Sequence, residues 1–243
     1  MSDPRPTTGP RAVVLDEDPD LAAAIAPERR DAARGASVAA VTSLPSGPWA
    51  FGNGDQLVHS GFGLLVLDGL LIRRVGLAGR FGAELLGPGD LLRPWEADGE
   101  AVPAHAFQTS WRVFAPVRFA VLDLAWAQRM APDPQVAAAI TGRALTRSRR
   151  LVAMMAIAQH PRLEERLWLL FAELAGRFGR VHADGVHINV PLTHEVLSHL
   201  AAARRPSVSG ALSRLAALGR VRREGRGWVL QARPDDDDVG AAA

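Results

Sequence analysis

The sequence predicts an α+β protein in which an N-terminal β domain is followed by a long helix and a C-terminal helical domain. Three observations predict this. Between residues 38 and 124, short apolar runs are separated by turns rich in glycine and proline, a pattern typical of antiparallel strands. Residues 135–159 contain no proline, and no glycine after Gly142, which favours one continuous helix. Residues 192–230 hold two short amphipathic helical patterns and then a basic hairpin pattern.

Length and composition exclude several classes of protein. A chain of 243 residues with 48% hydrophobic and 22% charged residues can bury a sizeable core in one large or two modest domains. The absence of cysteine excludes disulfides, thiolate zinc sites, cysteine-ligated iron–sulfur clusters and cysteine nucleophiles. No uninterrupted apolar run reaches the roughly 18 residues of a membrane span, and the N-terminus lacks an apolar signal core. We therefore expect a cytoplasmic protein without a membrane partner.

The charge is unevenly distributed. All basic residues other than histidine are arginine, and the net charge is +2. Residues 1–160 hold equal numbers of basic and acidic residues, whereas residues 161–233 hold 12 arginines and 6 acidic residues. The run Asp235–Asp238 then lowers the total. This asymmetry favours a polyanionic partner for the C-terminal third, although GC-rich coding would also replace lysine by arginine.

The first elements follow a tail over residues 1–12. In Val13–Asp20, alternating aspartates resemble the start of an EF-hand loop, but Leu21 and Pro27 occupy its glycine and glutamate positions. A receiver domain is excluded as well, because alternating βα units do not follow. The segment instead predicts a turn and an N-cap for a helix over Leu21–Ile25.

The β domain is expected to be an antiparallel sandwich or barrel. Its turns are predicted at Leu67-Asp68-Gly69 and at Gly87-Pro88-Gly89-Asp90. The clearest apolar runs are Phe62–Leu67, Leu70–Val75 and Phe119–Leu124.

The long helix carries small and apolar residues at alternating steps of four and three, which is the spacing of a helix–helix seam. Such a seam suits the close approach of a second helix, as in a dimer interface, or packing on the chain's own β domain, and the spacing alone does not decide between the two. Pro161 ends this helix, and a further amphipathic helix is predicted over Leu163–Phe178. The seam residues are Ala137, Thr141, Ala144, Ser148, Leu151, Met155 and Ala158.

Two helices follow within residues 193–218. Thr193 is a favourable N-cap for the first helix, and Pro206 suits the first position of the second. Residues 201–204 form the turn between them. The inward face of the first helix is predicted as Val196, Leu197 and Leu200, and that of the second as Val208, Ala211, Leu212, Leu215 and Leu218. The opposite face of the second helix is small and uncharged, with Arg205 and Arg214 at its edges, which suits entry into a groove.

A Gly-Arg-Gly turn at residues 225–227 predicts a basic β-hairpin behind these helices. Together the elements predict a winged helix-turn-helix, with the second helix in the major groove and the wing near the DNA backbone. An ordinary αα-hairpin beside a hairpin is the alternative. Arg205 is expected to read guanine, and Ser207 and the wing arginines to contact phosphates. The predicted DNA-binding residues are Thr193, His194, Arg204, Arg205, Ser207, Ser209, Gly210, Ser213, Arg214, Arg222, Arg223 and Arg226.

The segment 192–230 resembles the DNA-binding domain of the Crp/Fnr superfamily of bacterial regulators. The likeness rests on Leu192-Thr193-His194-Glu195 and on Arg205-Pro206-Ser207-Val208-Ser209. Phe62–Gly69 and Gly87–Leu92 look like the family's β-roll sensor domain, which has a jelly-roll-like double-stranded β-helix. The resemblance implies a homodimer, double-stranded DNA as partner and RNA polymerase as a further candidate partner. It also implies this division: tail 1–12, cyclic-nucleotide-binding-like β-roll 13–134, dimerisation helix 135–160, winged helix-turn-helix 161–232 and acidic tail 233–243.

The sequence departs from the family's cyclic-nucleotide motif. Gly99-Glu100 matches a fragment of the phosphate-binding Gly-Glu-Leu, but Arg112 and Arg118 are each followed by an apolar residue and not by Ser-Ala or Thr-Ala. Without such an arginine a buried phosphate lacks its bidentate partner, so cyclic AMP is not the expected effector. The effector is unknown from the sequence, and no cofactor or metal is expected.

Enzymatic interpretations fit less well. His194 and His199 are five residues apart and therefore miss the zincin spacing. A cupin-type metal site would need clustered ligands, but only His59 and His105 fall in the β domain. The expected function is a sequence-specific transcription regulator and not an enzyme. The alternative is an architectural DNA-binding protein with little sequence preference and no effector.

Overall fold

The computed structural model describes residues 10–50, 61–92 and 107–231. The chain divides into two compact units: Met1–Leu77 with Glu84–Arg150, and Ala78–Ala83 with Leu151–Ala243. The boundary between the units thus falls inside the long helix. The predicted acidic tail lies outside the described residues, as do most of the predicted N-terminal tail, Gly99-Glu100, His59 and His105.

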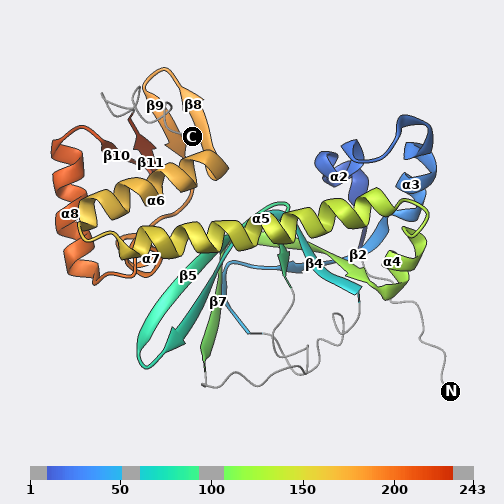
Figure 1. Cartoon of the computed structure of the whole chain (residues 1–243), viewed down its shortest axis with the longest axis horizontal. Helices are drawn as coiled ribbons and strands as arrows, with labels where there is room; N and C mark the ends of the chain where they lie inside the picture. The colour runs from blue at the N-terminus through green and yellow to red at the C-terminus, as the bar shows by residue number, and fades with distance from the viewer. Residues whose placement is uncertain (1–9, 51–60, 93–106, 232–243) are drawn as a thin grey trace. The chain divides into compact units, whose positions relative to one another are not determined.

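The N-terminal unit is built on one seven-stranded sheet (Figure 1). Its order is β1-β2-β7-β4-β5, with β3 paired to β7 and β6 paired to β4, and the paired strands are antiparallel. The prediction of an antiparallel β domain is confirmed. The strands are β1 (Arg11–Val13), β2 (Val38–Leu44), β3 (Gly47–Trp49), β4 (Gly61–Leu77), β5 (Arg80–Leu86), β6 (Leu91–Leu92) and β7 (Gln108–Asp123). Strand β1 includes Arg11 and Ala12, which the sequence analysis assigned to the tail.

One of the two predicted turns is wrong. The apolar runs on either side of Asp68 belong to the single strand β4, and its register against β7 shifts at Asp68. Gly69 has φ +94°, and a Cβ there would lie 2.2 Å from the carbonyl oxygen of Pro116. The Asp68-Gly69 pair is therefore a bulge that bends a continuous strand. The second turn is confirmed, because the backbone N–H of Asp90 donates to the carbonyl oxygen of Gly87 at 3.1 Å.

Short helices cover one end of this sheet (Figure 1). They are α1 (Val14–Glu17), α2 (Pro19–Ala23), α3 (Arg30–Ala36) and α4 (Leu124–Arg129), with a 3-10 turn at Pro27–Arg29. Trp126 of α4 is fully buried among them, and its indole N–H donates to the carbonyl oxygen of Ser37 at 2.9 Å. A second apolar cluster inside the sheet contains Phe119, with Trp49 and Trp111 packed against it.

The acidic run near the N-terminus is structural. Asp18 accepts the backbone N–H of Leu21 at 3.1 Å and caps α2, which begins two residues before the helix predicted over Leu21–Ile25. Three consecutive acidic residues each bind an arginine from a different element. The pairs are Asp16 with Arg34 of α3, Glu17 with Arg118 of β7, and Asp18 with Arg143 of the long helix.

The long helix α5 (Pro134–Gln159) confirms the predicted helix and starts one residue earlier. Its first part packs on the N-terminal unit through buried Val136 and Ile140. Arg147 donates to both carboxylate oxygens of Glu84 on β5, at 2.6 and 2.8 Å. A guanidinium in two hydrogen bonds fixes this face of the helix on the sheet.

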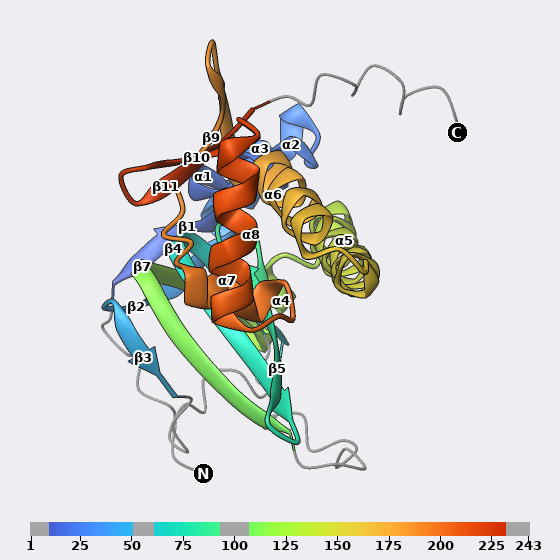
Figure 2. The same cartoon turned by 90° about the vertical axis from the view of Figure 1, so that its left-hand side faces the viewer.

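The C-terminal unit combines three helices with a four-stranded antiparallel sheet of order β10-β11-β9-β8. Helices α6 and α8 lie side by side, with the sheet strands beyond them (Figure 2). The sequence analysis found α6, α7, α8 and the β10–β11 hairpin but missed the β8–β9 hairpin. The elements are α6 (Leu163–Phe178), β8 (Gly179–His182), β9 (Gly185–Ile188), α7 (His194–Leu200), α8 (Arg205–Ala217), β10 (Val221–Glu224) and β11 (Gly227–Leu230). Within the described residues, no helix is both long enough and apolar enough to cross a membrane.

Candidate nucleic-acid interface

Helix α7 begins where the sequence places its cap. The Thr193 hydroxyl accepts the backbone N–H of Val196 at 3.2 Å, which satisfies one of the unpaired donors at the helix start. Val196, Leu197 and Leu200 are buried, as predicted. The turn to α8 passes through Ala202, whose φ of +48° is in the left-handed region.

Helix α8 buries one face and exposes the other. Val208, Ala211, Leu212 and Leu215 are buried, as predicted. The prediction for Leu218 is wrong, because α8 ends at Ala217 and the Leu218 side chain is 67% exposed. The buried face holds α8 against α6 and α7 and leaves its N-terminal turn, with Arg205 and Ser207, exposed to solvent.

The serines of α8 differ in what they can still bond. The Ser209 hydroxyl lies 2.8 Å from Nδ1 of His194 and 3.2 Å from the carbonyl oxygen of Arg205. A hydroxyl has one proton to donate, so these two contacts use most of its capacity. Ser213 is bonded only to the backbone oxygen of Ser209, at 3.1 Å, and its hydroxyl can still accept a bond from a ligand. His194 therefore positions Ser209 from inside the domain.

Three of the predicted DNA-binding arginines are engaged within the C-terminal unit. Arg214 forms an ion pair with Glu164 of α6. Arg222 forms ion pairs with Asp184 and Glu224.

The third engaged arginine, Arg223, lies against the body of the domain. It donates to the carbonyl oxygen of Leu192 at 2.9 Å, and its guanidinium carbon lies 5.0 Å from the centre of the Trp228 ring. These two contacts indicate that Arg223 holds the hairpin in place.

Three other arginines are exposed, and within the described residues they form no ion pair and no side-chain hydrogen bond. Arg204 precedes α8, and Arg205 is its first residue. Arg226 lies in the turn between β10 and β11, next to Gly225 with φ +53°. An uncommitted guanidinium keeps its donors for an anion or a base edge. Among the predicted DNA-binding arginines, the uncommitted ones thus lie at the start of α8 and at the hairpin tip.

Comparison with known proteins agrees with this geometry. Residues 162–234 match the family model of the Crp-like helix-turn-helix domain. Solved structures of similar fold include FixK2 from Bradyrhizobium japonicum, at 20% identity and a TM-score of 0.60, over 84% of this chain and 98% of that one. Residues 162–234 form a Crp-like helix-turn-helix domain.

Two further solved structures share the fold of this chain. A CRP-family transcriptional regulator from Thermus thermophilus is 20% identical, with a TM-score of 0.55 over 79% of this chain and 92% of that one. A CooA mutant from Carboxydothermus hydrogenoformans is 12% identical, with a TM-score of 0.60 over 90% of each chain. No curated protein sequence matches the chain. The similarity to these solved structures is one of fold.

Helix α5 exposes large apolar side chains. Leu145, Val152 and Met155 are 57%, 63% and 68% exposed. Of these three residues, only Met155 belongs to the predicted seam. The seam contains Ala144 and Leu151, which directly precede the exposed Leu145 and Val152 in the sequence. Sequence reasoning missed the two because a row through 145, 148, 152 and 155 fits helical spacing as well as the chosen one.

Proposed function

We propose that this chain is a transcription regulator of the Crp/Fnr type that acts as a homodimer. It binds a specific and roughly palindromic DNA sequence through α8, and cyclic AMP is not its effector. The observation that carries the proposal is Arg205, exposed and uncommitted on the first turn of α8. In helix-turn-helix proteins the N-terminal residues of the second helix reach the base edges of the major groove.

The chemistry of α8 supports sequence reading. The guanidinium of Arg205 can donate two hydrogen bonds to O6 and N7 of guanine, worth about 1–3 kcal/mol of discrimination. Ser213, with acceptor capacity left, supplies a more adaptable contact. Arg204 and Arg226 contact phosphates, which adds affinity without sequence information. This division leaves Arg205 as the main source of specificity.

The apolar row on α5 supports a homodimer. A helix with Leu145, Val152 and Met155 in water leaves apolar area uncovered, and a second copy of the same helix covers it. Because two copies related by a two-fold axis present two α8 helices, the DNA site has two half-sites.

The engaged arginines of the N-terminal unit argue against cyclic AMP. Arg118 donates to both carboxylate oxygens of Glu17, at 2.7 and 2.8 Å, so its fork is already filled. Arg147 likewise donates two hydrogen bonds to the carboxylate of Glu84. A phosphate arriving at either arginine has to displace a bidentate carboxylate.

The test is selection of bound sequences from random DNA by the full-length protein, followed by titration on the selected site and on a scrambled control. We expect a palindromic consensus and much tighter binding to it. Arg205→Ala should reduce discrimination at one guanine per half-site by about 1–3 kcal/mol. Equal affinity for selected and scrambled DNA would favour the architectural alternative.

Calorimetry with cyclic AMP tests the effector. We expect no binding, and a micromolar dissociation constant together with a rise in DNA affinity would refute the proposal that cyclic AMP is not the effector.

A further inference from the structure

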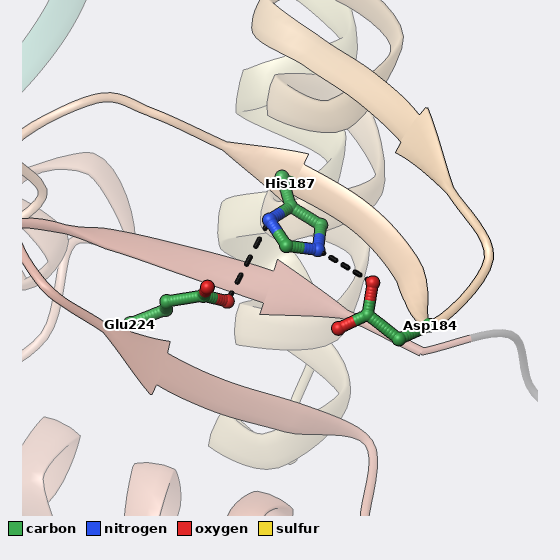
Figure 3. Close-up of side chains that lie close together, drawn as sticks. All are labelled: Asp184, His187 and Glu224. Atoms are coloured by element: carbon green, nitrogen blue, oxygen red, sulfur yellow. Dashed lines mark hydrogen bonds and ion pairs between the residues drawn. The ribbon is translucent and has the colours of Figure 1, made fainter.

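Three potential metal-ligating side chains meet on the sheet of the C-terminal unit (Figure 3). Nε2 of His187 lies 2.8 Å from Oδ1 of Asp184, and Nδ1 lies 3.5 Å from Oε2 of Glu224. One donor atom from each residue can be chosen so that all three lie within 4.8 Å of one another. The His187 side chain is 16% exposed, and the two carboxylates are about half exposed, at 52% and 49%. The cluster is therefore open to ions from solvent.

The sheet brings these residues together from two hairpins. Asp184 lies in the turn between β8 and β9, His187 lies on β9, and Glu224 ends β10. Strand β11 runs between β10 and β9, and Gly227 on it stands opposite Glu224. A Cβ on Gly227 would lie 2.5 Å from the carbonyl oxygen of Ile188, so the backbones approach too closely for a side chain there. Gly227 therefore places no side chain between Glu224 and β9, and the Glu224 carboxylate lies 3.5 Å from Nδ1 of His187.

A second imidazole adjoins the cluster. The ring of His182 on β8 lies 4.2 Å from the ring of His187, centre to centre, at an interplanar angle of 43°. Cross-strand pairing sets Arg180 opposite His187, so His182, two residues further on, lies diagonally across on the same face of the sheet. Two imidazoles beside two carboxylates form a donor set suited to divalent transition metals.

We propose that Asp184, His187 and Glu224 form a binding site for a divalent transition metal of the zinc class, with His182 as the fourth ligand. Two ligands of tetrahedral zinc, with bonds of about 2.0 Å, stand about 3.3 Å apart. The 2.8 Å between Nε2 of His187 and Oδ1 of Asp184 needs only a small opening, which the exposed Asp184 side chain permits.

Arg222 connects this site to DNA binding, and this step rests on the proposed function. Its guanidinium is paired with both Asp184 and Glu224. A metal ion that takes these carboxylates competes directly with Arg222 and releases it. The released arginine and the added positive charge both favour contact with DNA phosphates. Metal binding should therefore strengthen DNA binding without changing its sequence preference.

The first experiment measures metal binding alone, so it is independent of the proposed function. Metal-free full-length protein is titrated with Zn²⁺ in competition with a chromophoric chelator. We expect one Zn²⁺ per chain, with affinity reduced more than about tenfold in His187→Ala and in Asp184→Asn. Glu224→Gln and His182→Ala should also weaken binding. The matched control is His199→Ala, which removes a histidine 3.9 Å from Glu195 outside the cluster and should leave binding unchanged.

Thermal melts show whether each variant is folded. If His187→Ala does not fold, Asp184→Asn alone tests the site. Absence of saturable Zn²⁺ binding, or binding that survives both His187→Ala and Asp184→Asn, would overturn the site.

The second experiment repeats the DNA titration with and without Zn²⁺ at fixed salt. We expect tighter binding with Zn²⁺ for the native protein and a smaller gain for Arg222→Ala. Zn²⁺ binding with unchanged DNA affinity would overturn the link through Arg222 and leave the metal site standing.

Discussion

Replacing Arg223 by alanine should destabilise the β9–β11 sheet of the C-terminal unit. It should leave the salt dependence of DNA affinity nearly unchanged. Arg223 is exposed on β10, and its position in a basic wing predicts a phosphate contact. In the structure its Nη1 donates to the carbonyl oxygen of Leu192 at 2.9 Å, and its guanidinium stacks on Trp228 at 5.0 Å. These contacts tie β10 to the segment that precedes α7.

The magnitude follows from what the substitution leaves behind. A hydrogen bond from a charged donor is worth about 1.5–3 kcal/mol, and an exposed cation–π contact about 0.5–1 kcal/mol. The carbonyl oxygen of Leu192 also accepts the indole N–H of Trp228 at 2.9 Å, so losing Arg223 does not strand a buried acceptor. Because Arg223 is exposed, we expect the low end, about 1–2 kcal/mol. The same reasoning predicts a larger cost, about 3–5 kcal/mol, for removing the buried ring in Trp228→Ala.

Amide hydrogen exchange on the full-length protein measures this locally. We expect exchange in strands β9, β10 and β11 to accelerate by about 5–30-fold in Arg223→Ala, the factor that corresponds to 1–2 kcal/mol. The control is Arg226→Ala at the tip of the same hairpin, which should leave exchange unchanged. That control should instead reduce the slope of log affinity against log salt by about one. Unchanged exchange in Arg223→Ala together with a reduced salt slope would refute the structural role of Arg223.

Three further predictions concern other parts of the chain. Val152→Arg with Met155→Arg places charges in the proposed dimer face, so light scattering at micromolar concentration should show monomers, and a persistent dimer would move the interface elsewhere. A hydrogen bond from its own backbone N–H and one from Arg214 hold the pKa of Glu164 below its ordinary value. Its stabilising contribution is therefore present above that ordinary value and is lost as pH falls, so Glu164→Gln should flatten the acid-side decline in Tm, and an unaltered pH profile would contradict this. Gly69→Ala should destabilise the N-terminal unit by more than about 1 kcal/mol in urea unfolding, because a Cβ would lie 2.2 Å from the Pro116 carbonyl oxygen, and native-like stability would exclude the bulge.

Much of the DNA-binding segment could be read from the sequence because its signals are local. The Thr193 cap, the 3.6-residue spacing of apolar positions in α8 and the glycine-flanked turn at the hairpin tip all act within a few residues. The prediction that Leu218 is buried was wrong for a related reason, since the apolar spacing in the sequence continues past the point where α8 ends. The bulge in β4 was read as a turn because Asp-Gly favours either, and only pairing with β7 decides between them.

The sequence by itself determined the order of the long helix and the three helices that follow it, the basic C-terminal third and the helix that carries the exposed Arg205. Tertiary structure decided which arginines remain uncommitted. Arg214 pairs with a residue 50 positions away and Arg118 with one 101 positions away, and no local pattern encodes such distances. The same holds for Asp184, His187 and Glu224, where the sequence predicted no metal site. Charge type is a property of the residue, but whether a charge is available depends on which partner the fold places within about 4 Å of it.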